Sequence, residues 1–375
     1  MVSHSDIIVI GAGIAGASAA ALLAEDASVT LLEQEAHPGF HATGRSAAFY
    51  APFYGTDTVR RVSAASAEFY CKPPDQFSEV ELLRPRACLI VGDEGQSQTA
   101  RELQGSAPGL IALEPAEARR RIPILREDYP AHCLLDDRGG DLDVDAILQA
   151  YLRQARHRKG RIVTDSRVTS LESVNGSWRV CCGESRYQAP IIVNAAGAWA
   201  DELAHAAGLA GLGITPKRRT AVLVEPPQDI DISGWPLAVD MNEAFYFKPD
   251  AGLLLLSPAD ETPTSACDAQ PDELDIAIAV DRVLSVTELN VKRVAHAWAG
   301  LRSFAPDGEF VLGHDSRSRG FYWLAGQGGY GVQSAPALAE LLAEQITGRA
   351  LSGSFAPLKP LACELTPDRL LELKA

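Results

Sequence analysis

The chain has 375 residues, with 34 Lys or Arg against 49 Asp or Glu and a formal net charge of −15. A surface with this charge repels phosphate backbones and anionic lipid, which argues against nucleic-acid partners and peripheral membrane binding. The length is that of about two domains, and a chain this long buries a large core. A peptide or a disulfide-stapled scaffold is therefore excluded.

Residues 7–24 carry no charge and have the length of a short membrane span. Three glycines interrupt this stretch, and the first Lys or Arg of the chain is Arg45. A secretory signal needs a basic start, so we expect no targeting or transmembrane segment. The seven cysteines form no Cys-x-x-Cys pair. This pattern predicts reduced thiols in a cytoplasmic protein, with neither disulfides nor a metal site.

The first predicted element is Ile7–Ile10, a β-branched run typical of a strand buried on both faces. A glycine-rich turn follows, and residues 17–24 are rich in helix-forming Ala and Leu. A second buried strand, Val29–Leu32, leads to Glu33. Residues 50–130 are mixed, with prolines at several joints and no dominant period.

The strand–helix alternation returns with a helix that Asp143 or Asp145 caps and that runs to about Arg158. Asn175-Gly176 is a strong turn signal for a β-hairpin. Further strands are predicted at 168–171, 178–182, 191–193, 221–224, 245–248, 253–257, 310–312 and 321–325, and helices from 198, over 272–284 and over 335–346.

This order predicts two interleaved domains. Segments 1–45, 145–205 and 306–375 form one α/β nucleotide-binding domain of the Rossmann type. Segments 46–144 and 206–305 form a strand-rich second domain. The fold class is therefore α/β, or α+β for the chain as a whole.

The glycines Gly11, Gly13 and Gly16 have the spacing Gly-x-Gly-x-x-Gly between the first strand and the helix. The first glycine permits a tight turn, the second lets the backbone approach a pyrophosphate, and the third allows close helix–strand packing. Glu33 is placed to accept hydrogen bonds from a ribose. The motif predicts a dinucleotide site, but it does not distinguish FAD from NAD, and a glycine turn without a ligand is the alternative.

Two further segments favour the longer cofactor. The small-residue loop His41–Ala48 suits a cofactor that crosses the domain, and Gly326–Gly331 would let backbone approach a flat ring. A simple glycine turn between strand and helix explains the second segment equally well.

Six motifs together resemble the FAD-dependent D-amino-acid oxidase superfamily, and within it the D-arginine dehydrogenase type. They are GAGIAG at 11–16, HATGRSAA at 41–48, VNAAGAW at 193–199, FYFKPDAG at 245–252, AWAGLRSFAPDG at 297–308 and GQGGYGVQ at 326–333. The resemblance spans nearly the whole chain in order. It implies a Rossmann-like FAD-binding domain and a substrate domain with a mainly antiparallel sheet over the flavin. We expect the FAD to be non-covalent, with His41 hydrogen-bonding in its loop.

The resemblance also implies roles for individual residues. Arg302 would grip the substrate carboxylate, with Arg219 and Tyr246 around it and Tyr54 on a mobile loop over the site. The substrate pocket would contain Phe49, Ala51, Cys88, Gly329 and Gln333. The FAD would be bound by Gly11, Gly13, Ile14, Ala15, Gly16, Glu33, Thr43, Gly44, Arg45, Ser46, Ala47, Val168, Ala196, Gly197, Gly328, Tyr330, Gly331, Val332 and Gln333.

These residue types suit the removal of hydride from the α-carbon of an amino or hydroxy acid. A planar guanidinium binds a carboxylate at two points and so fixes its orientation as well as its charge. Tyrosine hydroxyls add directional contacts without net charge. The alternatives are a surface ion pair for Arg302, an ordinary strand residue for Tyr246 and an ordinary loop aromatic for Tyr54.

Three positions depart from the D-arginine dehydrogenase pattern. Cys88 stands in place of a glutamate, Phe49 in place of a histidine and Ala51 in place of a threonine. All three changes make the pocket less polar, and a buried guanidinium without a counter-charge is costly. We therefore expect a substrate with an apolar or neutral side chain.

The leading hypothesis is oxidative deamination of a D-amino acid, with hydride passing from the α-carbon to flavin N5 and the imino acid hydrolysing to a 2-oxo acid and ammonia. Oxidation of a glycine- or sarcosine-type amine, or of a 2-hydroxy acid, would use the same carboxylate contacts. A non-catalytic flavin-binding assembly factor and an NAD-dependent enzyme are the remaining alternatives. The sequence identifies neither a general base nor the electron acceptor, which is a quinone or oxygen.

Overall fold

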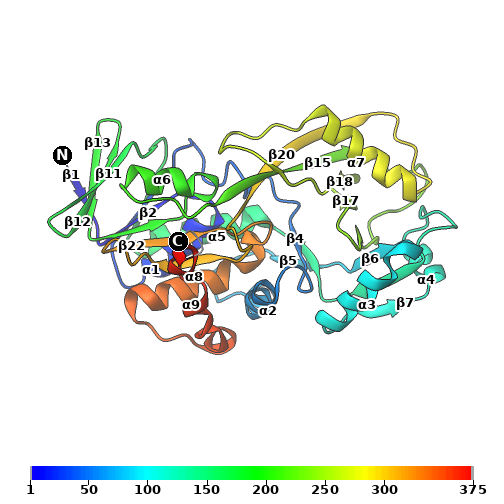
Figure 1. Cartoon of the computed structure of the whole chain (residues 1–375), viewed down its shortest axis with the longest axis horizontal. Helices are drawn as coiled ribbons and strands as arrows, with labels where there is room; N and C mark the ends of the chain where they lie inside the picture. The colour runs from blue at the N-terminus through cyan, green and yellow to red at the C-terminus, as the bar shows by residue number, and fades with distance from the viewer. Residues whose placement is uncertain (1, 373–375) are drawn as a thin grey trace.

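The structure is a computed structural model that describes residues 2–372, so residue 1 and residues 373–375 of the predicted cofactor domain lie outside the described residues. Figure 1 shows an elongated molecule with both termini in one lobe. The helices are α1 (Ile14–Leu23), α2 (Asp57–Cys71), α3 (Ser97–Ser106), α4 (Pro115–Arg121), α5 (Val144–His157), α6 (Ala200–Ala206), α7 (Glu273–Val286), α8 (Gly331–Thr347), α9 (Leu361–Glu364) and α10 (Asp368–Glu372). None of those within residues 2–372 is both long and apolar enough to cross a membrane.

The strands fall into four sheets. They are β1 (Val2–His4), β2 (Ile7–Ile10), β3 (Val29–Leu32), β4 (Phe49–Tyr50), β5 (Leu83–Pro85), β6 (Cys88–Gly92), β7 (Ile111–Leu113), β8 (His132–Asp136), β9 (Gly140–Leu142), β10 (Gly160–Val163), β11 (Ser170–Val174), β12 (Ser177–Cys182), β13 (Ser185–Ala189), β14 (Ile191–Asn194), β15 (Thr215–Val224), β16 (Leu237–Asp240), β17 (Tyr246–Asp250), β18 (Leu253–Ser257), β19 (Thr262–Pro263), β20 (Val294–Phe304), β21 (Val311–His314) and β22 (Phe321–Ala325).

The first lobe is built on a six-stranded sheet in the order β10-β3-β2-β14-β22-β21. Its strands are parallel except for β21, which pairs antiparallel with β22. Helices α1, α5 and α8 form one hydrophobic core with it, and the sheet β1-β13-β12-β11 and α6 form a second core on its other face. Both faces are therefore covered, which explains why β2 and β3 are continuous apolar runs.

The turn from β2 into α1 confirms the reasons given for two of its glycines. Gly11 has a φ of +101°, a left-handed conformation that favours glycine. A Cβ on Gly16 would lie 1.8 Å from the carbonyl oxygen of Gly11, so only glycine permits this close helix–strand packing. The uncharged residues 7–24 are thus a buried strand, a turn and a buried helix.

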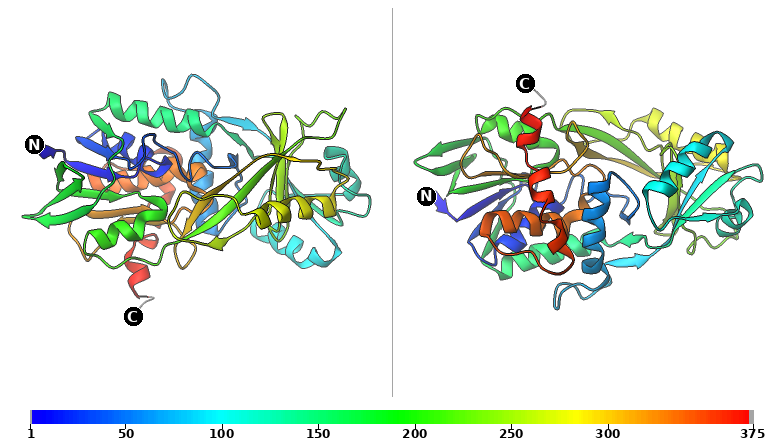
Figure 2. Two further views of the ribbon diagram at one scale, coloured as in Figure 1. Left: turned by 90° about the horizontal axis from the view of Figure 1, so that it is seen from above. Right: turned by 60° about the horizontal axis from the view of Figure 1, so that its bottom comes forward.

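The second lobe contains a nine-stranded sheet, mainly antiparallel as the resemblance implied. One pairing, β16 with β6, is parallel. The long strands β15 and β20 pair with each other from Thr215 and Phe304 onwards, and both run between the lobes (Figures 1 and 2). Residues on these two strands therefore reach the region where the lobes meet.

The packing of α2 bears on the proposed domain division. Its apolar residues, such as Val59 and Val62, lie in the same core as α1 and α8. Residues 57–71 thus pack with the first lobe. The sequence-based division places them, as part of segment 46–144, in the substrate domain. We retain the five-segment division as a proposal, with α2 transferred to the cofactor domain.

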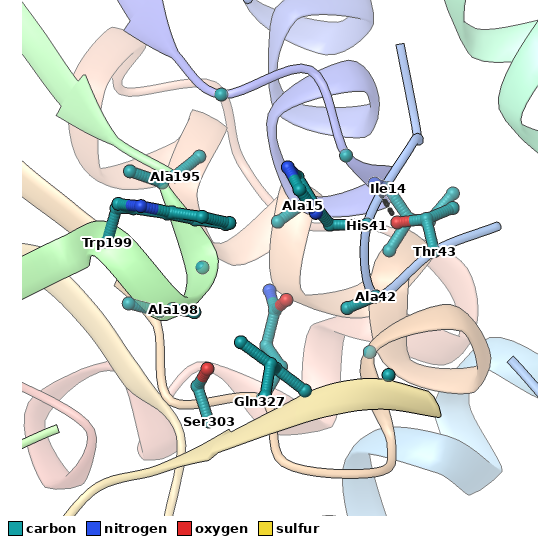
Figure 3. Close-up of a pocket in the computed structure, with 18 of the residues that line it drawn as sticks. Ile14, Ala15, His41, Ala42, Thr43, Ala195, Ala198, Trp199, Ser303 and Gln327 are labelled. Atoms are coloured by element: carbon teal, nitrogen blue, oxygen red, sulfur yellow. Dashed lines mark hydrogen bonds between the residues drawn. The ribbon is translucent and has the colours of Figure 1, made fainter. Parts of the chain in front are cut away.

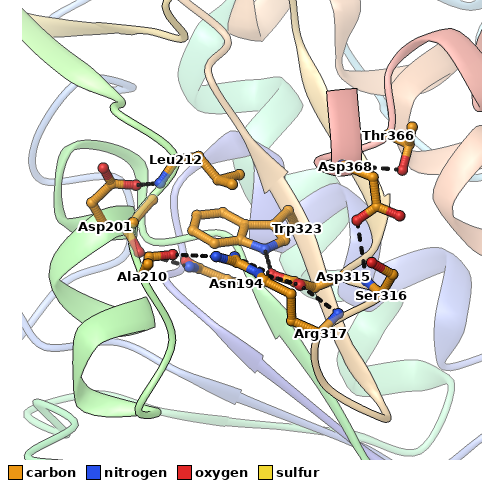
Figure 4. Close-up of polar contacts among 12 residues, drawn as sticks. Asn194, Asp201, Ala210, Leu212, Asp315, Ser316, Arg317, Trp323, Thr366 and Asp368 are labelled. Carbon is orange, nitrogen blue, oxygen red and sulfur yellow. Dashed lines mark hydrogen bonds and ion pairs between the residues drawn. The ribbon is translucent and has the colours of Figure 1, made fainter. Parts of the chain in front are cut away.

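A buried polar network braces the six-stranded sheet beside β21 and β22 (Figure 4). The fully buried carboxylate of Asp315 accepts hydrogen bonds from Trp323 Nε1 at 2.9 Å and from Arg317 Nη2 at 2.6 Å. Arg317 also donates to the carbonyl of Ala210 at 2.9 Å. Burial acts to raise the pKa of Asp315, but these donors lower it overall. The network ties β22 to the loop after α6.

Candidate active site

A cavity of about 310 Å³ lies at the carboxyl ends of the parallel strands, where α/β sheets bind their ligands. Glu33 and Ala195 border it after β3 and β14, and Gly326 borders it after β22. Arg219 of β15 and Arg302 of β20 enter it from the second lobe. The cavity is therefore enclosed by segments that are far apart in the sequence.

One wall of the cavity is the amino-terminal end of α1. The Ala12 N–H donates to Glu33 Oε2 at 2.7 Å, and the Ile14 N–H donates to Thr43 Oγ1 at 3.0 Å. Gly13, the N-cap residue of α1, provides no side-chain cap. The positive end of the helix dipole thus faces the cavity, as a phosphate site requires.

On the β20 side, the guanidinium of Arg302 lies against Gly329. A Cβ on residue 329 would be 2.7 Å from Arg302 Nη1, so glycine leaves the room that this guanidinium occupies. No carboxylate within residues 2–372 forms an ion pair with Arg302. Burial acts to lower its pKa, whereas the hydroxyls of Tyr54, Tyr246 and Tyr330 raise it overall. Arg302 is thus a charged cation available to an anionic ligand.

Arg219 enters the same cavity but already has protein partners. Its Nε donates to the Asp260 carbonyl at 2.8 Å, and its Nη2 lies 3.1 Å from Glu261 Oε1. In the β15–β20 ladder Arg219 stands opposite Gly300, and Arg302 is two residues further along β20. Alternation along a strand therefore places both arginines on one face of the sheet.

Tyr54 covers this end of the cavity from the loop after β4. Its hydroxyl donates to Glu243 Oε2 at 2.8 Å, and its ring centroid is 5.0 Å from that of Tyr330. Burial raises the pKa of Tyr54, so the hydroxyl is protonated at neutral pH. Outside Arg219, a more open hollow is lined by Met241, Asn242, Glu243, Ala259 and Glu261.

A family profile described as FAD dependent oxidoreductase (DAO) matches residues 6–345. The chain belongs to this FAD-dependent oxidoreductase family. It is 24% identical to an uncharacterised oxidoreductase, YurR, of Bacillus subtilis over 94% of this chain and 98% of the relative. It is also 24% identical to glycine oxidase of Bacillus licheniformis, over 92% and 93% of the two chains.

Solved structures confirm the fold of this FAD-dependent oxidoreductase. L-Proline dehydrogenase from P. horikoshii superposes with a TM-score of 0.84 over 99% of both chains, at 21% identity. Glycine oxidase from Geobacillus kaustophilus gives 0.83 over 95% and 98% of the chains, at 19% identity. The sequence-based expectation of this superfamily is therefore confirmed, whereas the D-arginine dehydrogenase type is not specifically found. The cofactor is FAD, which removes the NAD alternative.

The residues that line the cavity fit FAD. Two buried nitrogens there, His41 Nδ1 and Gln327 Nε2, have no hydrogen-bond partner within the described chain. Figure 3 shows both side chains beside the cavity, with His41 near Trp199. The His41 and Trp199 ring centroids are 4.5 Å apart, and His41 Nε2 lies 2.8 Å from Glu35 Oε1. Unpartnered polar atoms in a walled cavity indicate a polar ligand.

Most of the predicted site residues border this single cavity. On the cofactor side they are Gly11, Gly13, Ile14, Ala15, Glu33, Thr43, Arg45, Ser46, Ala47, Val168, Ala196, Gly197, Gly328, Gly331 and Val332; on the substrate side they are Arg219, Tyr246, Arg302 and Gly329. Their individual roles remain proposals. Arg45 also pairs with Asp268 and donates to the carbonyls of Ala269 and Ala299, which anchors the cofactor loop to the second lobe.

Other predicted residues lie outside the cavity lining. Gly16 and Gly44 support it through close backbone packing, since a Cβ on Gly44 would lie 2.7 Å from the Gly39 carbonyl oxygen. Tyr54 and Tyr330 contact each other in a T-shaped ring arrangement, with ring centroids 5.0 Å apart. Phe49, Ala51, Cys88 and Gln333 also lie outside the lining.

Two of these residues have buried structural contacts instead. Cys88 is fully buried in β6, where burial raises the pKa of its thiol. The Gln333 side chain accepts from the Ala51 N–H at 3.1 Å and donates to Ser63 Oγ at 2.8 Å. Cys88 therefore does not border the cavity, and Gln333 holds the loop that leads to Tyr54.

Several lining residues were not among the predicted ones. They include Gln34, His41, Ala42, Ser166, Arg167, Ala195, Ala198, Trp199, Ser303 and Gln327. Most lie within or next to the recognised motifs, so a wider margin around each motif would have included them. Gln34 is the second residue after β3, a buried strand of the parallel sheet, and such a position points to the ligand crevice.

Proposed function

We propose that this flavoenzyme oxidises the α-carbon of a D-amino acid with an apolar or neutral side chain. The observation that carries the proposal is the charged guanidinium of Arg302, which has no ion-pair partner in residues 2–372 and borders the cofactor cavity. A carboxylate is the group that such a guanidinium binds at two points. The D configuration rests on the resemblance to D-arginine dehydrogenases.

The surrounding side chains orient the substrate. Arg302 holds the carboxylate, and Arg219 adds positive charge that Glu261 partly offsets. Tyr246 borders the cavity and contributes a hydroxyl without net charge. Bound FAD supplies the hydride acceptor. Holding the carboxylate at Arg302 directs the α-carbon toward the cofactor. Such positioning lowers the activation free energy of a reaction by several kcal/mol.

The proposed deamination needs the substrate amine in its neutral form. Burial raises the pKa of Tyr54 and of Tyr330, so both hydroxyls remain protonated and serve as hydrogen-bond donors rather than bases. We therefore propose that the amine proton leaves to solvent before or during oxidation. The 2-oxo acid and ammonia then arise by hydrolysis of the released imino acid.

The apolar side chain is inferred from the core beside Tyr246. That core contains Ala51, Phe53, Cys88 and Ile90. None of these residues is charged, so the cavity wall that Tyr246 forms is backed by apolar packing and offers no counter-charge to a guanidinium or ammonium side chain. Oxidation of a glycine- or sarcosine-type amine remains the second candidate, because relatives of this chain include a glycine oxidase and a monomeric sarcosine oxidase.

Anaerobic flavin bleaching tests the proposal. The purified yellow protein is mixed with D- and L-amino acids, glycine, sarcosine, L-proline and 2-hydroxy acids, and oxygen is admitted afterwards. We expect D-Leu, D-Met and D-Phe to bleach the flavin fastest. D-arginine reacting at least tenfold faster than these would contradict the apolar side chain. Bleaching by sarcosine or glycine alone would favour the second candidate, and no bleaching by any compound would favour a non-catalytic flavoprotein.

A further inference from the structure

Gln327 has an unusual combination of burial and missing partners. Its Nε2 is buried, yet it has no hydrogen-bond partner within residues 2–372. The residue borders the cofactor cavity, and Figure 3 shows its carboxamide pointing into that space from the loop between β22 and α8. A buried amide donor without a partner costs free energy, so its retention here needs an explanation.

The backbone fixes where this side chain points. The Gly328 N–H donates to the Ser303 carbonyl at 2.8 Å, and the Tyr330 N–H donates to the Gln327 carbonyl at 2.9 Å. The loop is therefore bonded to β20 on one side and closed by its own turn on the other. These contacts fix the backbone of residue 327 at the border of the cavity, and its side chain extends from there into the cavity.

The carboxamide lies between the two functional regions of the cavity. A Cβ on Gly331 would be 3.3 Å from Gln327 Oε1 and 3.7 Å from Ile14 Cγ2, so Gln327 is close to the beginning of α1, the phosphate region. Two residues further on, Gly329 lies against the Arg302 guanidinium, which marks the region of the reacting ring. The part of a bound cofactor that connects the phosphate region to the ring region therefore lies next to Gln327.

The chemistry of a carboxamide selects its partner. Gln offers two donors and an acceptor, so it is fully satisfied by a group that both donates and accepts, such as a hydroxyl. In FAD, the segment between the flavin ring and the pyrophosphate is the ribityl chain, which carries hydroxyls. We propose that Gln327 hydrogen-bonds the ribityl hydroxyls of FAD and thereby contributes to cofactor affinity. This inference depends on FAD binding and not on the identity of the substrate.

The test compares FAD affinity and flavin potential in Gln327→Ala and Gln327→Glu. Holoenzyme is diluted in steps, and the fluorescence of released FAD gives the dissociation constant. We expect the constant to rise about tenfold in each variant, the effect of losing one hydrogen bond to a neutral group. The midpoint potential of the bound flavin should stay unchanged in Gln327→Ala, which adds no charge, because the contact is to the ribityl chain and not to the ring.

A matched control is Gln149→Ala, which removes a half-buried glutamine of α5 whose amide donates to Asp145 Oδ1 at 3.3 Å. Its FAD dissociation constant should equal that of the unaltered protein. An unchanged constant in both Gln327 variants would overturn the proposal, as would a shifted potential in Gln327→Ala, which would place Gln327 on the ring. Gln327→Glu keeps the size of the side chain, so it answers the question even if the alanine variant folds poorly.

Discussion

Arg302 and Arg219 enter the same cavity from neighbouring strands, but they differ in how much of their positive charge is already matched by protein groups. Arg219 is held by the Asp260 carbonyl and the Glu261 carboxylate, so part of its charge is already matched. Arg302 has tyrosine hydroxyls around it instead of a carboxylate. An anionic substrate therefore gains most from Arg302, and the two arginines should respond differently to mutation.

Replacing Arg302 with lysine tests the two-point contact. Lysine keeps the positive charge but cannot present two parallel N–H donors. With bonds to charged groups worth about 1.5–3 kcal/mol, losing one to two of them predicts a fall in kcat/KM of roughly a hundredfold. The flavin spectrum should not change. Arg293→Lys, in an exposed ion pair with Glu225, is the control and should be fully active. An Arg302→Lys enzyme within threefold of normal would refute the proposed role.

The protonation of Tyr54 gives a prediction about pH. Its raised pKa means that the tyrosinate appears only above the ordinary value of about 10, so Tyr54 does not titrate between pH 7 and 9. Over that range kcat/KM should rise with pH as the substrate amine loses its proton. Tyr54→Phe should lower the rate at every pH but keep this rise. A flat profile in the variant would identify Tyr54 as the base.

At the scale of elements, α8 is coupled to the loop that carries Tyr54. Gln333, in the first turn of α8, accepts from the Ala51 N–H and donates to Ser63 of α2. The helix that begins beside the cofactor therefore also holds the cover of the substrate region. This contact joins three elements that are distant in sequence.

Gln333→Leu should loosen that cover while leaving the cofactor in place. The buried Ala51 N–H would lose its partner, which costs about 1–3 kcal/mol of unfolding free energy. Because Tyr54 follows Ala51 in the same loop, we expect KM to rise several-fold without a change in the flavin spectrum. The control, Gln345→Leu, lies near the other end of α8 and bonds the Ala362 carbonyl. Equal KM values in the two variants would show that Gln333 is merely structural.

Local signals in the sequence predicted much of this fold. The turn Asn175-Gly176 has φ values of 51° and 78°, as its hairpin requires, and the helix capped by Asp143 begins at Val144. The region 50–130 gave no clear pattern because its elements serve different lobes: α2 packs on α8, whereas β6 joins the nine-stranded sheet. Sequence position cannot show which core a short amphipathic element joins.

The candidate site, like the fold, could be predicted from the sequence only in part. Gly11, Gly13 and Glu33 were predictable because one local motif contains all three. The missing partner of Gln327 depends on contacts between distant segments, which a single sequence does not display. Trp199 and Ser303 were missed although they lie inside recognised motifs, because only tertiary packing decides which residues of a motif border the cavity.

At the scale of the whole molecule, the cavity exists only when both lobes are assembled. Its walls combine Gly11, Thr43, Ala196, Arg302 and Gly331, which come from nearly the full length of the chain. An unfolded chain cannot offer these contacts together. FAD must therefore bind the folded state in preference to the unfolded state, and the free energy of unfolding must depend on its concentration.

Thermal unfolding at several FAD concentrations measures this dependence. At free FAD one hundred times its dissociation constant, linkage predicts about 2.7 kcal/mol of added stability, so Tm should climb steadily with the logarithm of FAD concentration. NAD shares the adenosine and pyrophosphate of FAD but lacks the flavin and ribityl groups, so at the same concentrations it should raise Tm less than FAD does. ADP should give a smaller increase, because the phosphate region at α1 is formed by a motif within one lobe. A Tm independent of FAD would mean that the cavity is not where the cofactor binds. Equal increases with ADP and FAD would mean that the binding free energy comes from the phosphate region alone and that the second lobe contributes nothing to it.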